Sequence, residues 1–498
     1  MYQVNDRISI SGHMGSVRYS GYLHVWPDTL AYGIEWDDSS RGKNDGTLEG
    51  IRYFECIGNA GSFVKASNSK IDPRKLFTEA IEDRYGRTTN DEALQHSIMF
   101  STKTVETVGF EKLNSKLDDY KNLSTLMLDR QCVLGAGKEA KLPNLEYLDL
   151  SYNLISLWHE IEEILNRTPN LKGLNLNGNR LGGGLLAQFP ETLTDLSLCD
   201  CNLDSEILSQ LHNSSINKLE LAGNNLTDAM LESWYPPLTL KVLDLSYNNL
   251  SRIPPQLSAF NINEIFLHHN LVKDFEEKHC FQHISSLDVR YNQFLTFSLI
   301  DPIPLVFPSL KLLRLSHCPA FSMLLIERMT VFLIGRLQCM TTKDGSGIVK
   351  LNGSGLLCSE VLEAELFFAS QLRNGLVAAI NNPSRMRYYQ EKYNVNLQKQ
   401  NQSVQSDRII ELYVYNVKDS SLILKRKFLQ NNTVLRLKGC IARQTRLSVP
   451  HFTVSFHMYN DENSSPRVLD DDIALLLSLS FVPSQKLYVS LKENCHLH

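Results

Sequence analysis

Apolar residues recur along the middle of the chain at a spacing that predicts a row of short strands. Between residues 123 and 320 the pattern L-x-x-L-x-L-x-x-N/C-x-L occurs nine times, with starts 22 to 26 residues apart. The apolar positions of each unit share one face of an extended segment, and the residues between them point outward. One unit cannot bury this face alone, so stacked units must share a continuous core. The units start at Leu123, Leu145, Leu171, Leu193, Ile216, Leu240, Ile262, Ile284 and Leu310.

The ninth position of the units predicts how each turn is held. An Asn side chain there can bond the backbone of the turn that leaves the strand, where a buried polar group without a partner would be costly. This period and consensus are typical of a leucine-rich repeat solenoid, an α/β architecture in which each repeat supplies a strand and a returning arm. We therefore interpret the column as architecture; it reads Gln131, Asn153, Asn179, Cys201, Asn224, Asn248, Asn270, Asn292 and Cys318.

The outward strand positions should line the concave face of the solenoid. In the column between the second and third apolar positions, four of nine residues are acidic and one is basic. The column has two interpretations: a solvated polar face, or a protein-binding surface with an acidic middle, because concave solenoid faces commonly bind partners. The candidate concave-face binding residues are Asp149, Glu220, Asp244, Phe266 and Asp288.

The first 75 residues have a different pattern, with short apolar and aromatic runs broken by glycine. Four such runs predict strands, at residues 4–10, 17–22, 31–37 and 50–56, with turn signals between them. This segment is expected to be a small all-β module with a modest core. The predicted core residues are Val17, Tyr19, Ile34, Trp36, Tyr53 and Phe54.

The remaining segments predict caps, a linker and a C-terminal domain. Residues 76–81 and 91–100 are predicted to be helical, and a further stretch of helical spacing follows the repeats. An open end of the solenoid would expose core, so both flanks should act as caps. The expected boundaries are 1–75 for the all-β module, 76–122 for a linker and N-terminal cap, 123–320 for nine repeats, 321–396 for a helical C-terminal cap, 397–407 for a linker and 408–498 for a C-terminal domain.

Composition and charge narrow the classes of function. The 498 residues are 43% hydrophobic and 21% charged, which is typical of a globular protein of several domains. A net charge of -5 argues against a partner that is nucleic acid or an anionic membrane. No apolar run reaches the roughly 18 residues that a membrane span requires. Scattered cysteines and a first segment without a secretory signal predict a cytoplasmic protein.

No catalytic or metal-binding constellation is recognisable. Residues 132–139 end in Gly-Lys-Glu and resemble part of a phosphate loop. A phosphate loop, however, needs Gly where Cys132 stands and Ser or Thr where Glu139 stands. Cys199 and Cys201 have no second pair at a metal-finger spacing. His268 and His269 are neighbours that would face opposite ways on a strand, which argues against joint metal ligation. We therefore expect a protein that is not an enzyme and has no cofactor and no metal.

Motifs within the first 75 residues resemble a CAP-Gly domain. The similarity is carried by Gly12-x-x-Gly-x-Val-Arg-Tyr19, Glu35-Trp-Asp37, Gly42-Lys-Asn-Asp-Gly46 and Gly50-x-x-Tyr-Phe-x-Cys56. The resemblance implies binding of the acidic, aromatic-ended C-terminal tail of α-tubulin. Lysine offers a point charge, asparagine offers amide donors, and aromatic side chains can receive a terminal ring. The candidate tail-binding residues are Gly42, Lys43, Asn44, Asp45, Gly46, Tyr32, Trp36 and Phe54, of which Trp36 also fits the core.

Residues 408–498 resemble a ubiquitin-like domain of the β-grasp fold, because two β-like segments, a helix and further β-like segments follow one another. The order of the three domains resembles the tubulin-folding cofactor E family. That resemblance implies a multidomain chaperone, cytoplasmic and cytoskeleton-associated, that binds α-tubulin and acts with other tubulin-folding cofactors in assembly or dissociation of the α/β-tubulin heterodimer. The alternative is a microtubule-associated scaffold that tethers partners through its CAP-Gly and repeat surfaces.

Overall fold

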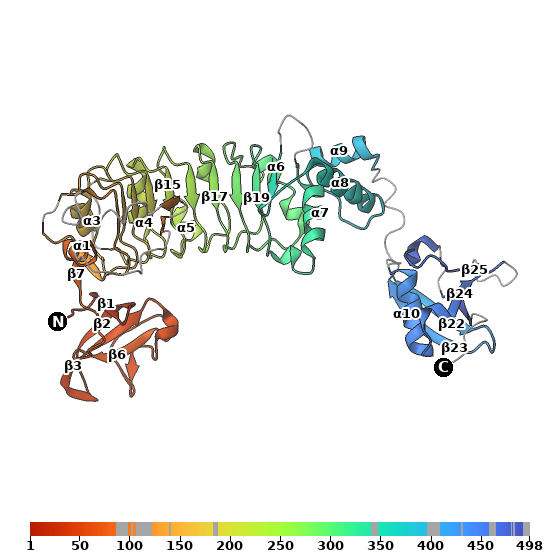
Figure 1. Ribbon diagram of the computed structural model, residues 1–498, viewed down its shortest axis with the longest axis horizontal. Coiled ribbons are helices and arrows are strands. Elements are labelled where there is room, and N and C mark those ends of the chain that lie inside the picture. Colours follow the sequence, from red (N-terminus) through yellow and green to blue (C-terminus); the bar gives the residue numbers. More distant parts are fainter. Residues whose placement is uncertain are drawn as a thin grey trace. The chain divides into compact units, whose positions relative to one another are not determined.

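The computed structural model divides the chain into two compact units (Figure 1). One unit comprises Met1–Leu372 and Val377–Asn394, and the other comprises Arg373–Leu376 and Val395–His498. None of the described helices is long and apolar enough to cross a membrane. The structure describes residues 1–85, 98–100, 103–105, 122–138, 141–182, 188–339, 347–395, 409–429, 432–457, 465–479, 481 and 484–491.

The first unit begins with a small antiparallel sheet, as the sequence predicts, but the fourth strand of this sheet is Gly61–Lys65, whereas the predicted strand at 50–56 is a strand only at Ile51–Arg52. Its four strands lie in the order β1-β2-β3-β6, and a two-residue turn joins the short hairpin β4-β5. The core of this sheet contains Ile8, Ile10, Val17, Tyr32, Ile34 and Trp36. The strands are β1 (Arg7–Ile10), β2 (His13–Leu23), β3 (Trp26–Trp36), β4 (Thr47–Leu48), β5 (Ile51–Arg52) and β6 (Gly61–Lys65), and the 3-10 helix η1 is Ser39–Arg41.

A short segment then covers the first end of the solenoid. Strand β7 (Lys75–Leu76) pairs in parallel with β11 (Val133–Gly135), and helix α1 (Phe77–Tyr85) buries Phe77, Ala80 and Ile81 in the solenoid core. This helix agrees with the one predicted at residues 76–81.

The helix predicted at residues 91–100 is wrong at its end. There the backbone forms an antiparallel pair between β8 (Ile98–Phe100) and β9 (Lys103–Val105). Two residues separate these strands, which is the spacing of a tight hairpin. Residues 91–97 lie outside the described residues.

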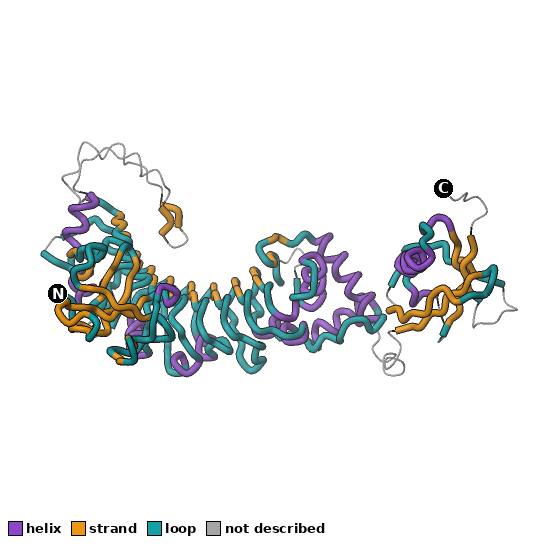
Figure 2. The backbone as a smooth tube through the Cα atoms, turned by 90° about the horizontal axis from the view of Figure 1, so that it is seen from below, coloured by secondary structure: helices purple, strands orange, loops and turns teal. Residues whose placement is uncertain are grey.

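The repeats form a parallel sheet in which every predicted unit supplies one three-residue strand. The middle residue of each strand is Leu or Ile, and each pairs with its counterpart in the next repeat. Figure 2 shows these strands side by side along one edge, with the returning arms behind them. The strands are β10 (Thr125–Met127), β12 (Tyr147–Asp149), β13 (Gly173–Asn175), β14 (Asp195–Ser197), β15 (Lys218–Glu220), β16 (Val242–Asp244), β17 (Glu264–Phe266), β18 (Ser286–Asp288) and β19 (Leu312–Arg314).

The returning arms differ from repeat to repeat because their lengths and sequences differ. Some contain short α-helices and others contain only 3-10 turns, and both bury apolar side chains against the strands. The helices are α3 (Trp158–Leu165), α4 (Ser205–Gln210), α5 (Asp228–Leu231) and α6 (Ile303–Val306), and the 3-10 helices are η3 (Leu211–Asn213), η4 (Pro255–Ala259), η5 (Phe297–Ile300) and η6 (Pro319–Phe321).

The asparagine column satisfies the turns, as predicted. Asn248 is an example: its Nδ2 donates to the carbonyls of Leu221, Leu245 and Ser246, while its Oδ1 accepts from the N–H groups of Asn224 and Leu226. A single side chain thus satisfies five backbone groups in two adjacent repeats.

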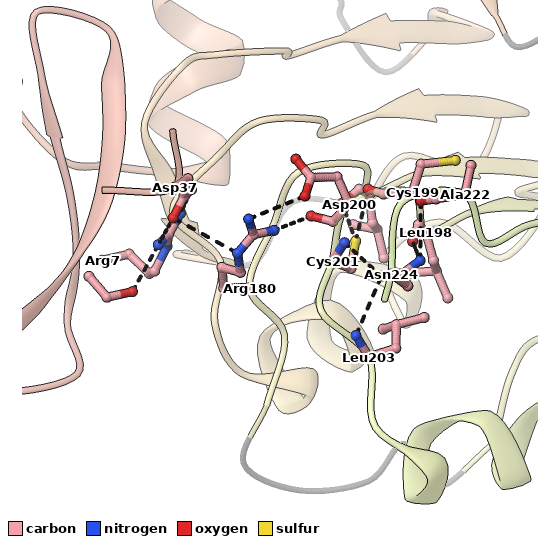
Figure 3. A network of polar contacts seen from close by, with 12 residues as sticks. Arg7, Asp37, Arg180, Leu198, Cys199, Asp200, Cys201, Leu203, Ala222 and Asn224 are labelled. Carbon is pink, nitrogen blue, oxygen red and sulfur yellow. Dashed lines mark hydrogen bonds and ion pairs between the residues drawn. The ribbon is translucent and has the colours of Figure 1, made fainter. Parts of the chain in front are cut away.

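A cysteine interrupts this column without leaving the turn unsatisfied. Figure 3 shows Cys201 beside Asn224, whose Oδ1 accepts from the Cys201 N–H at 2.9 Å. The Cys201 thiol in turn donates to the carbonyl of Leu176 at 3.3 Å. Burial raises the pKa of this thiol, so it remains protonated and able to donate.

The sheet continues beyond the nine predicted repeats. Strand β20 (Lys350–Leu351) pairs in parallel with β19 and then turns back into β21 (Ser354–Gly355). The Asn352 Oδ1 accepts from the Leu315 N–H at 2.7 Å, so it satisfies a backbone donor of the last repeat. The end of the solenoid is therefore closed partly by a hairpin, whereas the sequence predicted only helices there.

Three helices complete this end: α7 (Ile326–Arg336), α8 (Cys358–Arg373) and α9 (Pro383–Tyr393). Arg336 of α7 donates twice to the carboxylate of Asp301 in the preceding arm, and both side chains are buried. Glu365 of α8 is also buried; it pairs with Arg385 of α9 at 2.9 Å and accepts from the hydroxyl of Tyr393. These contacts attach the cap helices to the repeats and to one another.

The second unit has the β-grasp topology that the sequence predicts. Its sheet has the order β23-β22-β26-β24-β25, and its central strands β22 and β26 are parallel. Helix α10 packs Val434, Leu437 and Ile441 against the sheet. The elements are β22 (Ile409–Asn416), β23 (Leu422–Leu429), α10 (Val434–Thr445), η8 (Val449–His451), β24 (Phe452–Phe456), β25 (Arg467–Val468), η10 (Leu476–Leu479) and β26 (Gln485–Leu491).

Candidate functional site

The loop at residues 42–46 of the N-terminal sheet is held by close backbone contacts at its two glycines. A Cβ atom on Gly42 would lie 1.8 Å from the carbonyl oxygen of Asn59. Gly46 has a φ of +93°, and a Cβ atom there would lie 2.0 Å from the carbonyl oxygen of Phe54. Only glycine fits both positions, and the side chains between them take no part in these backbone contacts.

Lys43 and Asn44, between these glycines, present unpaired donors. The backbone N–H of each donates to the carbonyl of Gly61, which fixes the loop against β6. The Lys43 side chain is exposed and has no ion-pair partner among the described residues. The Asn44 Oδ1 accepts from the Gly46 N–H at 3.1 Å, so its Nδ2 is oriented and has no partner among the described residues. The loop therefore offers an ammonium group and an amide donor, a pair that suits a carboxylate.

Asp45, in the same loop, has a structural role. Its Oδ1 accepts from the Thr47 N–H at 3.0 Å, and its Oδ2 accepts from Arg52 at 2.8 Å. Hydrogen bonds from Thr47 lower the pKa of this carboxyl. Asp45 thus anchors the β4-β5 hairpin to the loop, and its negative charge is offset by the guanidinium of Arg52.

The three aromatic residues predicted to receive a terminal ring are buried. Tyr32, Trp36 and Phe54 are 3%, 6% and 7% exposed. Tyr32 and Trp36 lie on β3 with Ile34 between them, so strand alternation directs all three to the core face. Phe54 covers the backbone of Gly33, where a Cβ atom would lie 2.4 Å from its ring. The prediction that these three rings contact the peptide directly is therefore corrected: because the rings are buried, they can only support the loop from within the domain.

Another group of rings is accessible beside the loop. Tyr53 packs edge-on against Tyr19 and Phe63, with ring centroids 5.1 and 5.6 Å apart, and all three side chains are partly exposed. Phe63 also packs against Phe54, and the Tyr53 N–H donates to the carbonyl of Gly46. The sequence predicts Tyr19 and Tyr53 as core residues, and Phe63 is not among the residues that it singles out. Its position on β6, two residues after the Gly61 that holds the loop, is the signal that could have identified it.

Polar contacts orient the outer edge of this aromatic cluster. The Tyr53 hydroxyl lies 2.7 Å from Nδ1 of His24 and accepts from the His24 N–H at 3.0 Å. The Tyr19 hydroxyl donates to the carbonyl of Tyr22. Since these hydroxyls are already bonded, a ligand would contact the faces and edges of the rings.

The acidic column of the solenoid, predicted as a second binding surface, is largely tied up within the fold. Asp149 and Asp288 are only 5% and 2% exposed. Asp149 accepts from the Ser151 N–H and from the amide of Asn175, while Asp288 accepts twice from Arg290. The prediction that these two residues form an exposed charged stripe is therefore wrong, because donors of the same repeat and of the next one, Asn175 and Arg314, surround both carboxylates.

The other three candidate residues of the column, Glu220, Asp244 and Phe266, are half-buried. Glu220 accepts from Ser197 and pairs with Lys218, and Asp244 accepts from the N–H and hydroxyl of Ser246. Phe266 lies next in the column, between Asp244 and Asp288. Burial raises the pKa of both Asp149 and Asp244.

The N-terminal sheet contacts the first repeats of the solenoid. Figure 3 shows Arg180 between Asp37, whose Oδ1 lies 3.8 Å from its Nε, and Asp200, whose Oδ1 accepts at 3.2 Å. Asp37 also accepts from the buried Arg7. Beside this ion network, Met14 packs with Cys132 and Leu154 in a small apolar cluster.

Family models match two of the three regions. The model of the CAP-Gly domain matches residues 4–69, and two models of the leucine-rich repeat match residues 212–229 and 239–260. The candidate loop and its rings lie within the first match.

Similar proteins extend these matches along the chain. Protein PAC2 of Saccharomyces cerevisiae is 28% identical over 473 residues, which is 90% of this chain and 89% of that protein. Tubulin-specific chaperone E of Danio rerio is 32% identical over 265 residues, 50% of this chain and 49% of that protein. The aligned part thus spans about half the length of this relative.

Among solved structures, the C-terminal ubiquitin-like domain of mouse tubulin-specific chaperone E is 18% identical and covers 19% of this chain and 98% of that chain, with a TM-score of 0.17. The chain itself combines a CAP-Gly domain, leucine-rich repeats and a β-grasp domain in that order. In domain content and in aligned sequence, it resembles tubulin-specific chaperone E.

Proposed function

We propose that this protein is a tubulin-folding chaperone whose N-terminal domain captures the C-terminal tail of α-tubulin. One observation carries the proposal: Lys43 and Asn44 present unpaired donors on a rigid loop beside partly exposed aromatic rings. The similarity to tubulin-specific chaperone E supports the choice of tubulin as the partner.

The proposed binding step is recognition of a terminal carboxylate and its aromatic side chain. Lys43 and the amide of Asn44 would bind carboxylate oxygens, since charge-assisted hydrogen bonds are among the stronger polar contacts. The rings of Tyr53 and Phe63 would pack against the terminal ring in an edge-to-face or offset arrangement. Capture of a C-terminal carboxylate is a known mode of peptide recognition.

The wider activity is part of the same proposal, and the similarity to tubulin-specific chaperone E supports it. After tail capture, other surfaces of the chain would contact the body of α-tubulin and act with other tubulin-folding cofactors to assemble or dissociate the α/β heterodimer. All of these steps are binding steps, so the proposal assigns no enzymatic reaction to this chain. It also places the protein in the cytoplasm in association with the cytoskeleton.

Peptide calorimetry tests the tail-binding step. Replacing Lys43 and Asn44 together by alanine should weaken binding of an α-tubulin tail peptide by roughly 1 to 3 kcal/mol, the range for charge-assisted hydrogen bonds. Lys70→Ala is the matched control, because Lys70 is an exposed lysine of the same domain outside the loop. Equal affinity of the double variant and the control variant would show that this loop does not bind the tail.

A separate measurement distinguishes the chaperone from the scaffold. Full-length protein is mixed with soluble tubulin heterodimer, and the dimer fraction is followed by sedimentation velocity. A chaperone should bind soluble tubulin and change its dimer state. A scaffold should instead cosediment with microtubules and leave the dimers intact, and that outcome would overturn the chaperone assignment while leaving tail capture in place.

A further inference from the structure

The eighth position of the repeats forms a second column along the solenoid, where each strand turns into its arm. All nine residues have a left-handed backbone, with φ between 51° and 72°. The column reads Arg130, Tyr152, Gly178, Asp200, Gly223, Tyr247, His269, Tyr291 and His317. A left-handed residue is unusual outside glycine and asparagine, so this backbone shape is imposed by the repeat.

The last four members stack their rings into a ladder. The centroids of Tyr247 and His269 are 4.3 Å apart, those of His269 and Tyr291 are 4.1 Å apart, and those of Tyr291 and His317 are 4.4 Å apart. The planes of neighbouring rings differ by 3° to 11°. Tyr247 is 56% exposed.

The ladder stops at Gly223, which has no ring to continue it. A Cβ atom there would meet Asp200 first, at 3.7 Å, an ordinary contact distance. Among the described residues, no ring or cation covers the face of Tyr247 opposite His269. The column therefore has no side chain at Gly223, an empty place with the ring of Tyr247 in the next repeat and the backbone and Cβ of Asp200 in the preceding one.

The other glycine of the column shows that this emptiness is particular to Gly223. At Gly178, an added Cβ would lie 2.4 Å from the ring of Tyr152, so the preceding repeat already fills that place. The ring of Tyr152 is itself covered by the guanidinium of Arg130, 4.4 Å from its centroid. The first two repeats of the column thus contain an example of a guanidinium stacked on a tyrosine ring at the eighth position.

Charge around the empty place also favours a cation. The Asp200 side chain remains half exposed even though Arg180 contacts it. The two following strands end in Glu220 and Asp244. Arg180 is held between Asp37 and Asp200, and Lys218 pairs with Glu220. Arg41 and Arg130, which line a pocket together with Asp200, are stacked on the rings of Trp36 and Tyr152.

We propose that the place above Gly223, between Tyr247 and Asp200, binds an arginine side chain of a partner protein. The guanidinium would stack on the open face of Tyr247 and pair with the carboxylate of Asp200. Arginine suits this place better than lysine, because its planar group stacks on an aromatic face and bonds a carboxylate through two N–H groups. The site does not depend on tail capture by the N-terminal domain, so each can fail without the other.

Two labelled peptides of equal charge, tetra-arginine and tetra-lysine, provide the probes. Fluorescence anisotropy with the full-length protein at low salt should show about fivefold tighter binding of tetra-arginine, since stacking adds to the charge attraction for arginine. Tyr247→Leu removes the ring and should abolish this preference, whereas Tyr247→Phe keeps the ring and should retain it. Gly223→Asn fills the empty place with a residue that tolerates a left-handed backbone, and it should also abolish the preference.

Tyr291→Leu is the matched control, because both faces of Tyr291 are covered by other rings. This variant should keep the preference for tetra-arginine. Equal binding of the two peptides by the parent protein would overturn the proposal, as would a preference that survives in Tyr247→Leu. If a neutral tryptophan peptide binds in a Tyr247-dependent manner and tetra-arginine shows no preference, the place takes an aromatic side chain and the arginine assignment is wrong.

Discussion

The loop at residues 42–46 and the acidic column of the solenoid both place polar residues at positions expected to face a partner, yet only the loop presents donor groups, the Lys43 ammonium and the Asn44 amide, that have no partner among the described residues. In the loop, close contacts at Gly42 and Gly46 hold the backbone, and although the Asn44 Oδ1 accepts from the Gly46 N–H, the Lys43 ammonium and the Asn44 Nδ2 take no part in the fold. In the column, the carboxylates themselves hold the turns. A polar residue is thus available for binding only where other atoms have already satisfied the backbone.

The largest expected effect comes from reversing the charge of Asp288. Asp288→Lys would place an ammonium in a site that is 2% exposed and would face it towards Arg290 and Arg314. We expect a loss of about 4 kcal/mol in the free energy of unfolding, because a buried charge loses its partner. Urea denaturation measures this loss. Glu264→Lys, at a half-buried position of the neighbouring strand, is the control and should change stability far less; equal losses would mean that the burial of Asp288 does not matter.

Removing one asparagine of the ninth-position column should cause the next largest loss of stability. Asn248→Ala removes five hydrogen bonds to the backbone of two repeats and leaves the N–H groups of Asn224 and Leu226 without another partner among the described residues, so we expect a loss of about 3 kcal/mol. The neighbouring Asn249 has an exposed side chain, so Asn249→Ala should leave the thermal melt nearly unchanged. Similar melts for the two variants would contradict the role given to the column.

A glycine of the loop tests the other side of the comparison. Gly46→Ala adds a Cβ atom 2.0 Å from the Phe54 carbonyl at a residue with positive φ, and we expect it to destabilise the N-terminal sheet by about 2 kcal/mol. Gly50 also has a positive φ, but an added Cβ would have nothing within 4 Å. Gly50→Ala should therefore cost only about 1 kcal/mol. Hydrogen exchange of the β3 and β6 amides would measure both, and equal effects would show that the close contact at Gly46 is unimportant.

The repeating elements could be predicted from the sequence because the same physical requirement recurs at the same position. The position of each strand of the solenoid, and of each turn-bonding residue such as Asn248, follows from the repeat period alone. On β3, alternation with Ile34 places Tyr32 on the core face, so its burial could be predicted from the sequence even though it was a candidate tail-binding residue. The burial of Asp288 could not be predicted from the sequence, because it depends on Arg314 from the next repeat as well as on Arg290.

The smallest expected effect is a gain in stability when Asp244 loses its charge. Burial raises the pKa of this carboxyl above its ordinary value of 3.8, so the folded state holds the proton more tightly than the unfolded state. Its contribution to stability is therefore fully present below pH 3.8 and is lost as the pH rises through the higher folded pKa. In Asp244→Asn, the amide oxygen can still accept from Ser246, and the amide nitrogen replaces an oxygen that has no partner among the described residues. The variant should unfold at a slightly higher urea concentration than the parent at pH 7, and this advantage should shrink as the pH falls towards 4.

Asp149→Asn is the matched control, because its new amide would face the donor amide of Asn175 and should give no such gain. If the stability advantage of Asp244→Asn does not change with pH, the advantage does not come from removing the negative charge of Asp244.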